Sequence, residues 1–537
     1  MSYRVLSCFP FVGMALFSLL FVLLFNPTIS LESQAFYFNL LLGGGVGGGL
    51  FYLIGSFIQR NEFSPLLEGW GFAAMLAIGA APAFAMFGLH ALSFTPPATG
   101  QMAAALGEIK QSELRLPALD VKNAPLVPKG LAIRKASAAL SEIGSLSSQL
   151  TLGEMVKQEV NGKLVWVAFL ERADFFKWFS LDSAPGYVVV SATDYSEVKV
   201  VTEIDGKPLS MKYGPGSYFG EDLRRHVWLN FSATSFFSQF TPEIDDSGRP
   251  FFVVPIARPL LGSQVFMTEG VLTVDAQTGE IKQYTADNAP AWVDLIESED
   301  LVKTKIHKAG HFVNGAFNWS GKDKFKVSSL DQVFSSDGKS LWVAGITNTS
   351  FETGVQRFLF IDTRSGEISE HKVQGVLESR AKQIVVDSHT KVYEPSNAIP
   401  FLVDGRPTYV MSLSLGDAIY AYGMVDIESE TVFSSEQSLD DTFQAYLTAK
   451  SSSGLSVAEN PQGEIVEGVV LRIGQDIKTG RYTLLLVNEP RSFVASGSLS
   501  TLLAVTEPGD RARMNVRNVD PLAASAVSFN NLSLEQR

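Results

Sequence analysis

Cysteine is almost absent from this sequence. Cys8 is the single cysteine among 537 residues, and it lies near the N-terminus. One thiol cannot form a disulfide within the chain, and it cannot build a metal site from several thiolates. Small secreted domains held together by disulfides are therefore excluded. The globular part must be stabilised by burial of apolar side chains, which a chain of this length allows.

Charge is unevenly distributed, because the first 95 residues carry very little of it. The whole chain has 43 Lys and Arg against 56 Asp and Glu, which gives a net charge of −13. An acidic surface repels the phosphates of nucleic acids. We therefore expect no nucleic acid partner.

Motifs of the common enzyme families are missing as well. The sequence contains no Gly-x-Ser-x-Gly elbow, no P-loop and no dinucleotide-binding fingerprint. His307 and His311 have a spacing that can bind zinc on a helix, but Lys308 stands where a zinc protease has glutamate. We expect no catalytic residues, no metal ion and no cofactor. An enzyme with an unrecognised site is kept as an alternative.

Three apolar runs occupy the first 95 residues, over 9–25, 36–58 and 70–92. A helix needs about 20 apolar residues to cross a bilayer, and it satisfies its own backbone there. We predict three transmembrane helices in a bacterial inner membrane, with the lipid bilayer as one partner. Arg4 and Arg60 favour a cytoplasmic N-terminus and an extracytoplasmic position for everything after residue 95. A cleaved signal peptide over the first run is the alternative.

The second apolar run is rich in glycine. Glycines four residues apart let helix backbones approach closely. Two interpretations stay open: packing among the helices of one chain, and formation of an oligomer or docking on another membrane protein. The candidate packing residues are Gly43, Gly44, Gly45, Gly47, Gly48 and Gly49.

One short pattern recurs four times in the rest of the chain. It consists of a small polar residue, glycine, a basic residue, two variable residues, an aromatic residue and valine. A small polar residue followed by glycine favours a hairpin turn, and the aromatic and β-branched residues after the glycine suit a strand. Helical stretches between the copies then predict α+β units, each a small antiparallel sheet covered by a helix. The four copies begin at Asn161, Ser247, Asp337 and Asp404.

Each copy is followed by a second strand, and two of these strands end in a hairpin signal. The hairpins read Thr278-Gly279-Glu280-Ile281 and Ser365-Gly366-Glu367-Ile368. These strands and turns resemble PepSY domains, and the match is best over 248–281 and 338–368. The whole chain is also similar to multi-span bacterial membrane proteins that carry such units. The resemblance implies protein interaction or restraint of a peptidase, and not catalysis.

The C-terminal part has closely spaced short strands between 465 and 518. Five short strands of this kind resemble a small OB-like β-barrel. We divide the chain into membrane helices over 1–95, a linker or stalk with a helix over 96–155, four PepSY-like repeats over 156–460, the barrel over 461–520 and a flexible tail over 521–537.

A dense aromatic cluster lies early in the repeats. Packing in a core is the simpler interpretation, and contact with a membrane surface or a partner is the alternative. The candidate interface residues are Phe175, Phe176, Trp178 and Phe179.

The predicted function is that of a non-enzymatic, membrane-anchored envelope protein whose α+β repeats act as an interaction or scaffold module. A protein partner or a second copy of the chain is the expected partner. Regulation or inhibition of an envelope peptidase, which rests on the PepSY resemblance alone, is the alternative.

Overall fold

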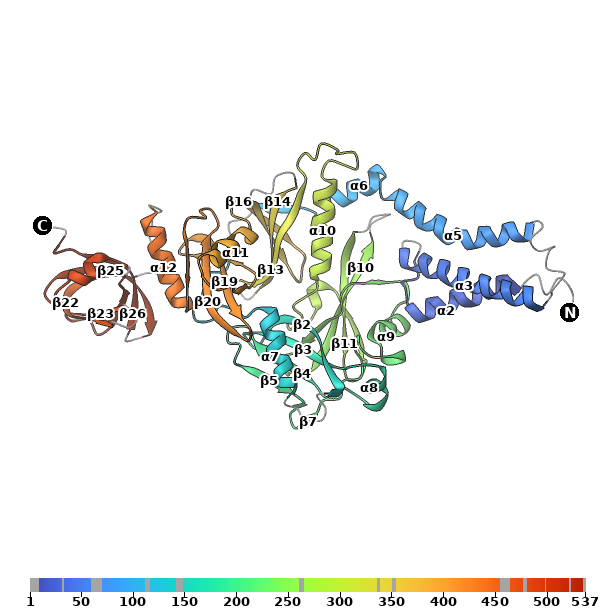
Figure 1. Ribbon diagram of the computed structural model, residues 1–537, viewed down its shortest axis with the longest axis horizontal. Helices are drawn as coiled ribbons and strands as arrows, with labels where there is room; N and C mark the ends of the chain where they lie inside the picture. The colour runs from blue at the N-terminus through green and yellow to red at the C-terminus, as the bar shows by residue number, and fades with distance from the viewer. Residues whose placement is uncertain are drawn as a thin grey trace.

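The computed structural model describes most of the chain (Figure 1). Figure 1 shows the N-terminal helices extending at one end, a central body of sheets and helices, and a small barrel at the opposite end. The described residues are 9–30, 33–58, 70–111, 116–141, 148–259, 265–335, 339–349, 354–453, 464–476, 481–497, 499–520 and 523–534.

The three apolar runs form helices α2 (Phe9–Phe25), α3 (Gln34–Ile58) and α5 (Trp70–Leu92). Within the described residues, however, none of the helices has the length and apolar character needed to cross a membrane. The prediction of three transmembrane helices is therefore wrong. The predicted location, an inner membrane with an extracytoplasmic body, depended on these helices and is wrong as well.

Several features of these three helices differ from those of an ideal membrane span. Helix α2 has 17 residues, which is short of the roughly 20 that a bilayer requires. The middle of α3 is largely glycine, and α5 contains Pro82 among many alanines and glycines. Such small side chains add little apolar surface per residue.

The central body consists of four units, and in each a helix precedes an antiparallel sheet. The first unit comprises α7 (Lys129–Ser141), β2 (Leu150–Val160), β3 (Lys163–Arg172), β4 (Tyr187–Ser191) and β5 (Val198–Val201). The second comprises α9 (Leu223–Asn230), β8 (Phe236–Phe237), β9 (Thr241–Ile244), β10 (Pro250–Pro259), β11 (Phe266–Asp275) and β12 (Ile281–Tyr284).

The third and fourth units repeat this order. The third comprises α10 (Glu299–Phe312), β13 (Phe325–Phe334), β14 (Ser340–Asn348), β15 (Val355–Asp362) and β16 (Ile368–Gly375). The fourth comprises α11 (Glu378–Asp387), β17 (Glu394–Pro395), β18 (Ile399–Val403), β19 (Arg406–Leu415), β20 (Ala418–Asp426) and β21 (Phe433–Glu436), with α12 (Leu439–Ser452) after them.

The hairpin turns predicted from the repeated pattern are present. Asn161 and Gly162 join β2 to β3 with φ of 51° and 75°, and Asp404 and Gly405 join β18 to β19 with φ of 47° and 78°. A two-residue turn that matches strand twist needs positive φ at both positions. The third copy of this turn, at 337–338, lies outside the described residues.

The basic residue of the pattern has a structural role in two units. Arg249 lies 2.6 Å from Asp275, and Arg406 Nη2 lies 2.9 Å from Asp426 Oδ1. Each aspartate ends a strand and also accepts backbone N–H groups of the next turn, as Asp426 does from Glu428 at 2.9 Å. The basic residue of the repeated pattern and the aspartate at the end of the later strand therefore connect the first hairpin of a unit to its last hairpin.

The four units are arranged as two pairs, each with a shared core. Phe169 of the first unit packs edge-on against Phe252 of the second, with ring centroids 5.2 Å apart. Phe358 of the third unit and Tyr409 of the fourth belong to another common cluster. Sheets that pack face to face exclude water between them, so neither member of a pair is an isolated domain.

The segment expected to be a stalk is packed into this body instead. Helix α6 (Pro96–Ala103) covers α10, and β1 (Ile109–Gln111) pairs in parallel with β16. Leu126 is buried with the third and fourth units, whereas Val127 is buried with the first and second. The segment therefore connects all four units.

The C-terminal module is a closed barrel of β22 (Glu464–Asp476), β23 (Arg481–Leu486), β24 (Ser492–Ser496), β26 (Ala523–Asn531) and β25 (Arg511–Asp520), in that spatial order. Strands β24 and β26 are parallel, and the others are antiparallel. The expected flexible tail over 521–537 is therefore wrong for most of its length, because β26 lies within it and closes the barrel.

Candidate interaction surface

A short helix, α8 (Phe175–Ser180), carries the aromatic residues singled out in the sequence. Asp174 begins the helix, because its side chain accepts a 2.9 Å hydrogen bond from the Lys177 backbone. No side chain of α8 is buried. Phe176 and Phe179 are 77% and 79% exposed, so these rings face solvent.

A second segment adds two more aromatic rings beside α8. Tyr218 precedes the 3₁₀ turn η2 (Phe219–Glu221), and its ring lies 5.2 Å from that of Phe175. The Phe219 ring lies 5.6 Å from that of Trp178 and is 60% exposed. We call this group the aromatic patch: Phe175, Phe176, Trp178, Phe179, Tyr218 and Phe219.

An ion pair between a buried arginine and a partly exposed glutamate supports the aromatic patch. Arg172 is almost fully buried, and its Nη2 lies 2.8 Å from Glu221 Oε2. The Trp178 indole donates a 2.7 Å hydrogen bond to that same carboxylate oxygen. Arg172 also donates to Ser217 and to the Lys212 carbonyl at 2.7 and 2.8 Å. Charge-assisted bonds of this kind fix the platform that carries the rings.

Phe219 has a strained backbone. Its φ is 52°, in the left-handed region that aromatic residues rarely adopt. Such a conformation costs on the order of 1–3 kcal/mol and persists only where the surrounding structure enforces it. Strain of this kind concentrates at binding and catalytic sites, and here it turns a phenyl ring outward.

The structure bears on one of the two interpretations of the cluster. Packing in a core is excluded for Phe176 and Phe179 by their exposure. Sequence reasoning missed Tyr218 and Phe219, which are about 40 residues away from α8. The adjacent aromatic pair followed by Gly220 was the available signal, since a large ring next to a flexible glycine is typical of a shaped loop.

Two of the candidate glycines, Gly43 and Gly47, lie at a close helix contact within the chain. A β-carbon on Gly43 would lie 2.5 Å from the Phe17 carbonyl oxygen, and one on Gly47 would lie 2.2 Å from that of Gly13. A β-carbon on Gly44 would meet the Ser18 hydroxyl at 3.4 Å, and one on Gly45 would meet nothing within 4 Å.

Gly43 and Gly47 therefore serve the close approach of α3 to α2. Gly48 and Gly49 lie in α3, outside the residues whose surroundings are described.

The histidine pair on α10 does not form a metal centre with its neighbours. The His307 and His311 rings are stacked 6.1 Å apart. Burial and the nearby Lys324 lower the pKa of His311. Across the described ranges, no group of three His, Cys, Asp or Glu residues is arranged to hold a metal ion.

A buried pair of carboxyl groups lies between the first three units. Glu243 accepts hydrogen bonds from the backbone of Asp294 and Leu295 at 2.9 and 3.3 Å, and Asp294 accepts one from Glu159 at 2.8 Å. Burial raises the pKa of Glu243 well above its ordinary value and that of Asp294 to about 7. These carboxyl groups hold backbone segments together, which is a structural task.

Comparisons with known proteins do not assign this fold. No protein-family model and no curated protein matches the sequence. A glycosyl hydrolase from Bacteroides ovatus is 11% identical with a TM-score of 0.18, over 70% of this chain and 93% of the other.

Apocarotenoid oxygenase from Synechocystis, in a mutant form, is 12% identical with a TM-score of 0.13, over 71% of this chain and 65% of the other. At such scores these likenesses carry no argument about fold or activity.

Proposed function

We propose that this chain is a non-enzymatic interaction module whose α+β units support a rigid aromatic patch for a partner protein. One observation carries the proposal: three phenyl rings are more than half exposed on a platform in which the buried Arg172 pairs with the partly exposed Glu221. Peptidase regulation and an unrecognised enzymatic site stay predictions, because no feature of the aromatic patch favours either.

The physical argument concerns the free energy of exposing the rings. A large apolar side chain that stays exposed to water does not contribute the roughly 1.5–3 kcal/mol of stabilising free energy that its burial would give. The strained backbone of Phe219 lowers the stability further. Aromatic side chains that are pre-ordered on a fixed backbone bind at little cost in conformational entropy. They are also typical of the few interface residues that dominate binding free energy.

The test compares two double variants in cells of the native host. Phe176→Ser with Phe179→Ser removes the exposed rings of the aromatic patch. The matched control is Phe317→Ser with Trp319→Ser, which removes another exposed aromatic pair, 74% and 88% exposed. In-cell cross-linking followed by mass spectrometry measures the recovery of bound protein for each chain.

We expect the parent and the control variant to recover the same partner, and the patch variant to recover at least about tenfold less of it. Sedimentation of the purified chain shows whether that partner is a second copy. Equal recovery by the patch variant, with an unchanged melting temperature, would contradict the proposal. A parent chain that recovers nothing and sediments as a monomer would contradict it as well.

A further inference from the structure

A cavity of about 500 Å³ lies where the four units meet. Its walls come from residues 125–134 with the start of α7, from β2 and β3 of the first unit, and from the start of β9. Residues 295–299, strands β13 and β14 of the third unit and residues 394–399 of the fourth complete them. The volume falls within the range of about 300–1,000 Å³ that is typical of small-molecule sites. Lys129 and Glu394 at its edge are exposed, so the cavity opens to solvent.

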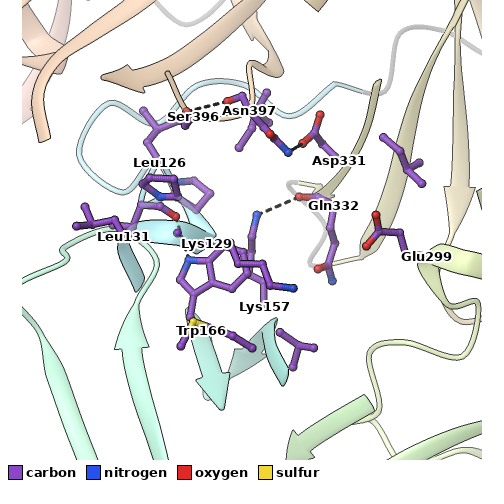
Figure 2. Close-up of a pocket in the computed structure, with 18 of the residues that line it drawn as sticks. Leu126, Lys129, Leu131, Lys157, Trp166, Glu299, Asp331, Gln332, Ser396 and Asn397 are labelled. Carbon is purple, nitrogen blue, oxygen red and sulfur yellow. Dashed lines mark hydrogen bonds between the residues drawn. The ribbon is translucent and has the colours of Figure 1, made fainter. Parts of the chain in front are cut away.

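A buried lysine lies on one side of this cavity. Lys157 is in the middle of β2, and its ammonium group donates a 3.3 Å hydrogen bond to the Gln332 carbonyl oxygen. The same ammonium lies 5.4 Å from the centre of the Trp166 ring (Figure 2). An ammonium has three N–H donors, and a neutral carbonyl and an aromatic face do not neutralise its charge. Burial lowers the pKa of Lys157.

A buried carboxylate lies on the other side. Asp331 is in β13, and its Oδ1 accepts a 2.9 Å hydrogen bond from the Asn397 amide (Figure 2). Its Oδ2 is buried and has no hydrogen-bond partner among the described residues. An unsatisfied buried acceptor costs about 1–3 kcal/mol, and more when it is charged. Burial and the charge of Glu378 raise the pKa of Asp331 to about 6.

These two groups belong to different units and do not bond to each other. In the described part of the chain, the ion pairs within 4.0 Å include neither Lys157 nor Asp331. Buried charges are normally paired or hydrogen-bonded. A cavity that holds opposite charges apart is therefore complementary to a molecule that carries both charges.

The remaining wall is mixed, with polar and charged side chains such as Glu154 and Glu299 as well as apolar ones. Large apolar side chains gather beside the two charges, which favours a ligand with an apolar body. They are Leu126, Leu131, Met155, Trp166, Leu330 and Trp342.

We infer that this cavity binds a small zwitterion with an apolar side chain, of the class of apolar amino acids and short apolar peptides. The ligand carboxylate accepts from Lys157, its ammonium donates to Asp331, and its apolar part lies against Trp166 and Leu131. The cavity is separate from the aromatic patch, so this inference and the proposed function can fail independently.

The test uses the purified full chain and a series of three probes. L-leucine carries both charges, 4-methylpentanoate lacks the ammonium, and 3-methylbutylamine lacks the carboxylate. Isothermal titration calorimetry gives the dissociation constants, and a change in the intrinsic tryptophan fluorescence, to which Trp166 and Trp342 of the cavity wall contribute, reports binding. The dipeptide of leucine and alanine extends the series. We expect leucine or the dipeptide to bind at least about tenfold more tightly than either single-charge analogue.

Two variants assign each charge to its partner. Lys157→Met keeps the length of the side chain, and Asp331→Asn keeps the shape and an acceptor for the Asn397 amide. Lys157→Met should weaken the binding of leucine and of 4-methylpentanoate by about tenfold or more and leave the affinity for the amine unchanged. Asp331→Asn should weaken the binding of leucine and of the amine and leave the affinity for 4-methylpentanoate unchanged.

The probe series on the parent chain is decisive even if a variant does not fold. Absence of heat and of a fluorescence change at millimolar leucine and millimolar dipeptide would overturn the inference. Equal affinity of leucine and its two analogues would also overturn it, as would variants that fold and bind all three probes like the parent.

Discussion

At the scale of single residues, buried charges mark the junctions between units. Lys305 of α10 lies 2.8 Å from Glu297, and both side chains are buried. The Trp342 indole donates to the Glu297 carbonyl oxygen at 2.8 Å, so the same residue anchors the third sheet. A charge in such a place is costly to leave alone, since water cannot solvate it.

This junction predicts a large effect of one substitution. Lys305→Met removes the ammonium and leaves the Glu297 carboxylate buried without it. We expect the free energy of unfolding to fall by about 3–5 kcal/mol, the usual result of breaking a buried ion pair from one side. Urea unfolding followed by circular dichroism measures it.

The matched control lies two residues away on the same helix. Lys303 is exposed and pairs with Glu299 one turn earlier. Lys303→Met should cost less than about 0.5 kcal/mol, because exposed pairs contribute little. Equal effects of the two substitutions would show that burial does not set the strength of the Lys305 junction.

Single residues also show which features of the surface and of the cavity could not be predicted from the sequence. The density of aromatic residues identified Phe176 and Phe179, because composition is local information. The platform beside them is built from Arg172 and Glu221, which are distant in the sequence and are brought together by the fold. Lys157 and Asp331 read as ordinary strand residues, since the cavity between them is formed by separate units.

At the scale of elements, α3 packs on α2 through two glycines four residues apart. Their partners, Gly13 and Phe17, are also four residues apart, so one ridge of backbone meets another. Close backbone contact of this kind gains dispersion attraction over the whole helix length. It also makes the contact intolerant of any added atom.

Two alanine substitutions in α3 test that contact. Gly47→Ala places a methyl group 2.2 Å from the Gly13 carbonyl oxygen, so the helices must separate. We expect a loss of about 1–3 kcal/mol from overpacking. Hydrogen–deuterium exchange of α2 and α3 peptides should become faster.

Gly45→Ala is the control, because its β-carbon meets open space. Alanine is a better helix former than glycine, so this change should stabilise α3 by about 0.5–1 kcal/mol. Exchange that is equally fast in both variants would mean that helix propensity, and not the contact with α2, explains the result.

Elements with local signals were predictable and those that need a distant partner were not. The turns at Asn161 and Asp404 were predictable because two residues fix the backbone. Strand β26 was mistaken for a frayed tail, since small polar residues become a strand only beside β24 and β25. The bounds of the first helices were predicted closely, but the membrane interpretation overestimated their apolar surface, since glycine and alanine read as part of an apolar run.

At the scale of the whole molecule, residues 286–298 form a strap between the paired units. Arg364 of the third unit donates to the carbonyl oxygens of Ala289, Pro290 and Ala291 at 2.8, 2.9 and 3.2 Å. Asp294 and Glu243 hold the same strap to the first and second units. The strap therefore couples the stability of three units.

The strap predicts a dependence of stability on pH. Burial raises the pKa of Asp294 from 3.8 to about 7, so the fold favours its protonated form. This contribution is complete below about pH 4 and is lost as the pH rises through 7. The free energy of unfolding should fall by about 1–3 kcal/mol over that range, with Glu243 acting in the same direction.

Asp294→Asn removes the titration but keeps an acceptor for the Glu159 backbone. Its urea unfolding should show a flatter pH profile and a higher stability than the parent at pH 8. Asp287→Asn changes an exposed aspartate of the same strap and should leave the profile unchanged. A parent-like profile in Asp294→Asn would show that other groups control the pH dependence.

The parallel pairing of β1 with β16 also sets the order of events during synthesis. Lys110 and its partner Glu367 are 257 residues apart in the sequence, and Leu126 and its hydrogen-bond partner Ser412 are 286 residues apart. At about 5–20 residues per second, β1 leaves the ribosome roughly 10–50 s before its neighbour exists. The first and second units can close in that interval, whereas the third and fourth must admit a segment made long before them. The segment of the body that is synthesised first is thus among the last to adopt its final position.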